Sequence, residues 1–253
     1  MKKNLVSLLT LLMAILLVSC ENNDANDLDN NYWSCEQLLD TTGLKLYPFV
    51  PFTDEESMFT NYGDKLDRRQ IPEDFLQEMT TKELFYQFVY TDLSKSMLTF
   101  NSRQQGFLAV AGQLNILPEL LNRTDAGHVL LELLQKVDPA KINAPDCFWC
   151  DYCLQIILAQ PEVINRMTDN DIDRYIHYQI RCHDTLLNLK NDYPANAALL
   201  LFCLGNVMIR YEFKPFIQTL EKNPDTNELI WDTQFINEQY ALQIIDNIKK
   251  FKT

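Results

Sequence analysis

The sequence predicts an all-α protein. Helix signals recur along the chain, because Ser or Thr followed three residues later by Gln or Glu precedes runs of apolar residues at helical spacing. Strand signals are scarce, since the chain has no Asn-Gly or Asp-Gly turn and no sustained alternation of β-branched residues. Many helices joined by short loops favour stacked antiparallel helical hairpins, a solenoid-like α-α superhelix. The alternative is an irregular α-helical bundle.

The helices can be placed in chain order. Three pairs match the capping-box pattern and predict helix starts: Ser34 with Gln37, Thr80 with Glu83, and Ser102 with Gln105. Apolar periodicity predicts four further helices, over His128–Val137 (capped by Thr124), Thr168–Lys190 (capped by Thr168), Ala195–Phe213 and Trp231–Phe251. Five prolines lie near the starts of such runs, as the first helical turn favours: Pro72, Pro145, Pro161, Pro194 and Pro215.

Residues 41–71 are the exception. Their apolar run Tyr47-Pro48-Phe49-Val50-Pro51-Phe52 contains two prolines and cannot be helical throughout. We expect an extended strap packed on the helices, and the alternative is a recognition segment.

The composition is that of a globular protein. Of 253 residues, 47% are apolar and 23% are charged, which excludes disordered, collagen-like and multi-span membrane proteins. Asp and Glu number 35 against 22 Lys and Arg, a net charge of −13. So negative a surface repels nucleic acid and anionic membranes, and neither is expected as an electrostatic partner.

The first 19 residues predict export. Lys2 and Lys3 precede an apolar stretch from Leu5 to Val18, which is too short to span a bilayer but has the length of a signal-peptide core. The stretch ends Leu17-Val18-Ser19-Cys20, which resembles the lipobox of bacterial lipoproteins. The resemblance implies that Cys20 is cleaved free and acylated, and so partners the lipid bilayer. The alternatives are a plain secretory peptide and an uncleaved anchor.

The residues after Cys20 predict a tether. Residues 20–31 are polar and acidic, and a segment so poor in apolar residues cannot pack. An acidic stretch here resembles the signal that sends lipoproteins of Bacteroidetes to the outer face of the outer membrane, although a solvated spacer has the same composition. The predicted organisation is therefore a signal peptide (1–19), a flexible acidic tether (20–31) and one all-α domain (32–253).

A second resemblance covers roughly residues 71–135. The segments that carry it are Ile71-Pro72-Glu73-Asp74, Met79-Thr80-Thr81, Gln104-Gln105-Gly106-Phe107 and Leu120-Leu121-x-Arg123-x-Asp125-Ala126-Gly127. They resemble a group of helical lipoproteins of unknown function from gut Bacteroidetes. The resemblance implies a helical fold and a lipid anchor, and it transfers no activity or catalytic residue.

Cysteine usage is the sharpest chemical feature. Besides Cys20 the chain has six cysteines, which allow 15 disulfide pairings in an oxidising compartment. Cys147, Cys150 and Cys153 form a C-x₂-C-x₂-C run at an expected helix N-terminus. One interpretation is a buried helix with cysteines as small apolar fillers, a second is a disulfide. A third is a redox or soft-metal site, with Cys182 and His183 as further ligands.

No other motif carries chemistry. Residues 169–180 fail as a calcium loop, because Arg174 replaces the required Gly and Ile180 the required Glu. Nucleotide-binding, hydrolase and zinc-protease motifs are absent, so we predict no catalytic residue and no cofactor.

Three functions follow from these observations. The leading hypothesis is a non-enzymatic lipoprotein of the cell envelope, expected at the outer membrane, that binds another envelope protein or a glycan. Exposed aromatic residues clustered on one face would favour it; the candidates are Tyr32, Trp33, Phe49 and Trp231. The alternatives are a hydrolase acting on a glycan or peptidoglycan, which needs two carboxyl groups about 5–10 Å apart, and the cysteine site.

Overall fold

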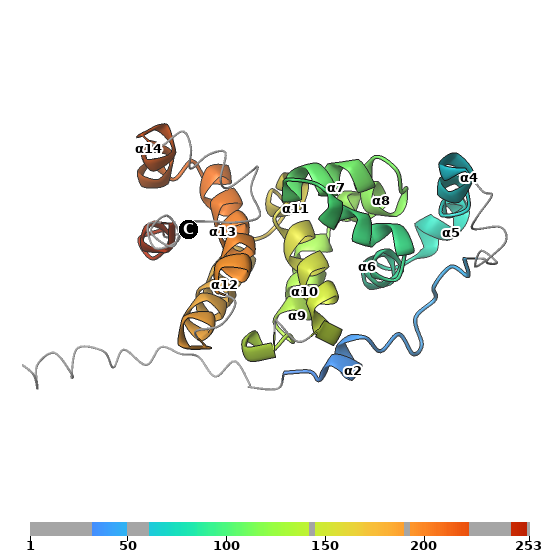
Figure 1. Ribbon diagram of the computed structural model, residues 1–253, viewed down its shortest axis with the longest axis horizontal. Coiled ribbons are helices and arrows are strands. Elements are labelled where there is room, and N and C mark those ends of the chain that lie inside the picture. The colour runs from blue at the N-terminus through green and yellow to red at the C-terminus, as the bar shows by residue number, and fades with distance from the viewer. Residues whose placement is uncertain (1–31, 50–60, 142–144, 190–192, 223–243, 252–253) are drawn as a thin grey trace, which may run out of the picture. The chain divides into compact units, whose positions relative to one another are not determined.

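The computed structural model describes residues 32–49, 61–141, 145–189, 193–222 and 244–251 (Figure 1). The described residues are about 70% helical and contain no strand, which confirms the all-α prediction. Contacts divide the chain into two units, Met1–Asn31 and Tyr32–Thr253, and every described residue belongs to the second. The predicted signal peptide, the predicted lipidation site Cys20 and the predicted tether lie outside the described residues.

The helices follow one another closely along the chain. Their order is α2 (Cys35–Leu38), α4 (Tyr62–Asp67), α5 (Glu73–Glu78), α6 (Thr81–Val89), η1 (Asp92–Thr99), α7 (Arg103–Ala111), α8 (Ile116–Asn122), α9 (Ala126–Leu134), η2 (Pro139–Lys141), α10 (Pro145–Leu158), α11 (Pro161–Ile164), α12 (Asp169–Leu189), α13 (Tyr193–Arg210) and α14 (Lys214–Lys222). A last helical segment covers 244–248.

Most of the predicted caps are confirmed. Ser34 and Thr80 form complete capping boxes. Ser102 Oγ accepts a hydrogen bond from Gln105 N at 3.1 Å, and Thr168 Oγ1 accepts one from Asp171 N at 3.1 Å. These side chains satisfy amide groups that a helix start leaves without partners.

The predicted cap at Thr124 is wrong. Helix α9 begins at Ala126, and its N-cap Asp125 makes no side-chain cap hydrogen bond. The Asp125 carboxylate instead accepts a hydrogen bond from Thr81 Oγ1 of α6. A contact between two helices has therefore replaced the local cap.

Helix α10 is the centre of the core. Every residue from 150 to 160 is buried, and α10 contacts α2, α6, α9, α11 and α13. Helix α13 is buried along residues 198–208 and contacts α10, α11, α12 and α14. Neighbours therefore cover α13 on several sides, as a helix that is apolar over most of its circumference requires.

The long helices lie close to their predicted positions. The prediction over Thr168–Lys190 corresponds to α12, and the prediction over Ala195–Phe213 corresponds to α13. Most of the helix predicted over Trp231–Phe251 lies outside the described residues. Contacts of α9 with α10 and of α12 with α13 join consecutive helices, as a stack of hairpins requires, and the stacked arrangement remains a prediction. None of the described helices has the length and apolarity needed to cross a membrane.

The strap prediction for residues 41–71 holds in its first part. Residues 44–49 are not helical, and Leu44, Leu46 and Tyr47 pack half-buried against the core. Residues 50–60 lie outside the described part of the chain. The prediction is wrong for 62–67, which form α4, because Asn61 Oδ1 accepts a hydrogen bond from Asp64 N at 3.0 Å and caps a helix there.

Candidate functional site

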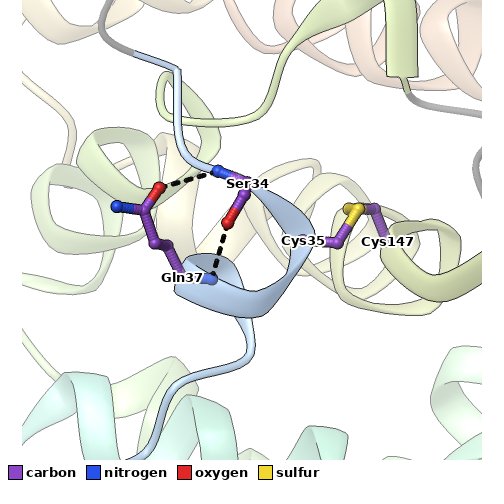
Figure 2. Close-up of a disulfide and its surroundings, with 4 residues drawn as sticks. All are labelled: Ser34, Cys35, Gln37 and Cys147. Atoms are coloured by element: carbon purple, nitrogen blue, oxygen red, sulfur yellow. Dashed lines mark hydrogen bonds between the residues drawn. A yellow bond between two sulfur atoms is a disulfide. The ribbon is translucent and has the colours of Figure 1, made fainter.

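A disulfide joins Cys35 to Cys147. The bridge links residues 112 positions apart, with 5.3 Å between their Cα atoms. Figure 2 shows it beside the two hydrogen bonds of the Ser34–Gln37 capping box, which measure 2.8 and 3.2 Å. The box orders a single helical turn whose first residue is Cys35, and so directs its side chain toward the first turn of α10.

The other four described cysteines are free thiols in the core. Cys150, Cys153, Cys182 and Cys203 are each fully buried. Burial raises the pKa of all four thiols, that of Cys203 to about 12, so each stays protonated and unreactive. The disulfide interpretation therefore holds for Cys147, and the interpretation as core filler holds for Cys150 and Cys153.

The structure does not bring together the metal site that was the third interpretation of the cysteines. Cys147 is committed to its disulfide, and His183 Nδ1 lies 3.0 Å from the carboxylate of its neighbour Asp184. Across the described ranges, no group of three or more His, Cys, Asp or Glu side chains could hold a metal ion.

Asp151 is a buried acid that sequence reasoning missed. It lies on α10 at 1% exposure, and its Oδ2 accepts a hydrogen bond from Gln155 Nε2 at 2.7 Å. Its other carboxyl oxygen is buried without a hydrogen-bond partner, as are the Tyr175 hydroxyl and the Gln179 side-chain amide on α12. Burial raises the pKa of Asp151 to about 7, and the bond from Gln155 only partly opposes this.

Among the described residues, the other two buried acids behave in the opposite way. Burial acts against the charged forms of Glu83 and Asp171, but hydrogen bonds outweigh it and lower the pKa of both carboxyl groups. For Glu83 the main donors are Thr80 N and Lys45 N, and for Asp171 they are Thr168 and His128. Neither acid shares a hydrogen-bond partner with Asp151.

The described aromatic residues that were candidates for ligand binding are half-buried and packed against cations. Tyr32, Trp33 and Phe49 are half-buried, and each ring faces a different cation. The three cations are Arg181 at 5.5 Å, Lys82 at 5.8 Å and Arg69 at 5.4 Å from the respective ring centroids. Trp231 lies outside the described residues. These three side chains therefore do not form the exposed cluster that would favour glycan binding.

A polar row on α6 holds the N-terminal segment. Its members are Glu83, Tyr86, Gln87 and Tyr90, at positions i, i+3, i+4 and i+7, and each is hydrogen-bonded to the backbone of residues 38–47. Sequence reasoning assigned Glu83 only to a cap. The available signal was the spacing, since helical periodicity places these polar side chains on one face of an otherwise apolar helix.

Comparisons of the chain with models of known protein families, with curated proteins and with solved structures gave no match.

Proposed function

We propose that this protein is a lipoprotein of the cell envelope, anchored through acylated Cys20, whose all-α domain is a non-enzymatic binding module. The observation that carries the proposal is the Cys35–Cys147 disulfide. Disulfides persist in oxidising compartments outside the cytoplasm, so the bridge agrees with the export signal at residues 1–19. The outer membrane is the proposed location, and another envelope protein or a glycan is the proposed partner.

The place of the disulfide also suits an anchored protein. Cys35 follows Cys20 by only 15 residues and is bonded to the central helix α10. A force applied at Cys20 would therefore act on the disulfide to α10 before it acts on the residues that follow Cys35. Two or three acyl chains would hold the protein stably, at about 0.8 kcal/mol for each buried methylene.

A hydrolase is the second candidate, and Asp151 is the observation in its favour. A carboxyl group with a pKa near 7 suits a general acid or base. Such a group must reach its substrate, however, and Asp151 is 1% exposed. The burial of this acid therefore favours the binding module.

The anchor can be tested with the full chain in a host that processes lipoproteins. We expect wild-type protein in the membrane fraction, with mass spectrometry finding acyl chains on an N-terminal Cys20. Cys20→Ala should move the protein to the soluble fraction, because no other residue is proposed to carry lipid. Cys35→Ser is the matched control and should stay in the membrane. Retention of Cys20→Ala in the membrane would contradict the proposal.

A further inference from the structure

The α6 row bonds to the main chain of residues 38–47, which comprise the end of α2, a turn and the non-helical residues that follow it. Glu83 Oε1 accepts a hydrogen bond from Lys45 N at 2.6 Å, and Gln87 Oε1 accepts one from Tyr47 N at 2.6 Å. The Gln87 side-chain amide also donates to the Tyr47 carbonyl at 3.3 Å. A single side chain thus satisfies both backbone groups of one residue, as a neighbouring strand would.

The two tyrosines extend the same contact toward the disulfide. The Tyr86 hydroxyl donates to the Leu38 carbonyl at 2.6 Å, and the Tyr90 hydroxyl donates to the Leu39 carbonyl at 2.7 Å. All of these bonds are made to backbone atoms, which every peptide presents. Selectivity comes from the buried side chain of Leu38, which is 1% exposed. Main-chain bonds with an apolar anchor are the way many proteins bind extended peptides.

We propose that the α6 row is a binding surface for a peptide segment whose apolar anchor ends a helical turn and whose following residues are non-helical. The chain's own residues 38–47 occupy it while the Cys35–Cys147 disulfide is intact, and reduction by an external dithiol opens it. The inference rests on the proposed function, because it names the partner class of that binding module.

The disulfide is the strongest restraint on the occupying segment. Helix α2 spans only Cys35–Leu38, and a single turn is unstable on its own. In the described residues upstream of it, Trp33 N donates a hydrogen bond to the Lys136 carbonyl at 2.9 Å. Once the covalent link is removed, residues 32–39 are held by that bond, by the contacts of Tyr32 with Arg181 and of Trp33 with Lys82, by the two tyrosine hydroxyls and by the burial of Leu38. A competing peptide can supply the last two of these.

The two cysteines of the disulfide differ in their exposure to an attacking thiolate. Cys35 is half-buried, whereas Cys147 is 4% exposed, so an incoming thiolate reaches the Cys35 sulfur first. The disulfide bond then breaks, and Cys147 leaves as a thiolate and takes up a proton. Cys147 is the third residue of α10, where the helix dipole stabilises a departing thiolate. The second thiol of the reductant attacks the mixed disulfide, releases Cys35 as a thiol, and leaves the reductant as a cyclic disulfide.

Covalent capture tests the proposal on the full chain. The protein carries Cys35→Ser, which leaves the Cys147 thiol without its partner. The probe is a synthetic peptide of residues 32–49 whose cysteine is activated as a mixed disulfide with thionitrobenzoate. Its control is a scrambled peptide with the same composition and the same activated cysteine. Peptide mapping by mass spectrometry measures capture at Cys147 itself, so the result does not depend on whether Cys20 is acylated.

We expect the native-sequence peptide to be captured at least ten times faster than the scrambled peptide. Adding Gln87→Ala should bring its rate close to that of the scrambled peptide, because the bonds to Tyr47 are lost. Oxidised wild-type protein should capture neither peptide. Equal rates for the two peptides on the Cys35→Ser protein would overturn the binding surface.

Hydrogen exchange provides a second readout that needs no variant. Reduction of the wild-type protein with dithiothreitol should speed exchange at the Lys45 and Tyr47 amides, while amides within α10 and α12 stay protected. Unchanged exchange at these two amides after verified reduction would overturn the role of the disulfide in opening the surface. Loss of protection throughout α10 would overturn it too, because the whole domain would then be unfolding.

Discussion

Two buried carboxyl groups show that burial alone does not set the charge of an acid. Glu83 accepts hydrogen bonds from Thr80 N and Lys45 N, which favour the carboxylate and lower its pKa. Asp151 accepts one from Gln155, and burial raises its pKa to about 7. The two acids therefore affect stability in opposite directions as the pH changes, because linkage depends on the sign of the shift.

Asp151 should make the protein less stable as the pH rises. Its pKa in the folded state, about 7, exceeds its ordinary value of 3.8, so the folded protein holds this proton more tightly than the unfolded chain. The free energy of unfolding should fall between about pH 4 and pH 7, by up to roughly 4 kcal/mol. Asp151→Asn removes the titration and should stabilise the protein more at pH 8 than at pH 4.5.

Urea unfolding at these two pH values measures the effect. Glu162→Gln is the matched control, because Glu162 is exposed, and its stability should follow that of the wild type. A pH dependence that is the same in Asp151→Asn as in the wild type would show that this carboxyl group does not titrate in the expected range.

At the scale of elements, helix packing depends on close backbone approaches. Helix α7 lies against η1 at Gly106, where an added Cβ would collide with the Met97 carbonyl oxygen and lie 3.0 Å from the Met97 carbonyl carbon. The obstacle is backbone, which cannot rotate away as a side chain does. Glycine is thus required here for space rather than for an unusual backbone conformation.

Gly106→Ala should therefore separate η1 from α7 and lower the free energy of unfolding by about 1–3 kcal/mol. Gly112→Ala is the control, because its Cβ would lie 3.4 Å from the Leu108 carbonyl oxygen, an ordinary contact at an exposed position. Thermal unfolding followed by circular dichroism compares the two. A Gly106→Ala protein as stable as Gly112→Ala would contradict the packing described for α7.

At the scale of the whole molecule, one disulfide between the N-terminal segment and the core closes a long loop of the chain. The 112-residue separation of Cys35 and Cys147 restricts the unfolded chain strongly. The Cys35→Ser/Cys147→Ser double variant should lose about 4–5 kcal/mol of unfolding free energy. Guanidinium unfolding of the wild type and of the double variant, both without reductant, measures this difference in the free energy of unfolding.

The Cys182→Ser variant is the comparison for a buried cysteine outside the disulfide. It should lose stability through burial of a hydroxyl group, and it should keep the mobility of the oxidised wild type on non-reducing gels. A double variant as stable as the wild type would show that the closed loop contributes nothing to the folded state.

Local signals explain why so much of the fold was predictable. Caps such as Thr80 and Thr168 act on amides two or three residues away, and the apolar circumference of α13 reflects burial that any all-α arrangement must provide. The prediction of a helix cap failed where a side chain bonds to a residue that is distant in the sequence. Asp125 bonds to Thr81, 44 residues earlier, and so α9 begins without the expected cap.

The residue pattern by itself determined the helical class, the predicted export signal and the inventory of cysteines, because periodicity, apolar length and composition are properties of neighbouring residues. Only the tertiary structure decided that Cys35 is bonded to Cys147, that Asp151 lies in the core, and that α6 binds residues 38–47. Each of these depends on which distant segments meet. The packing of the whole core determines which segments meet, and it cannot be predicted from a short stretch of sequence.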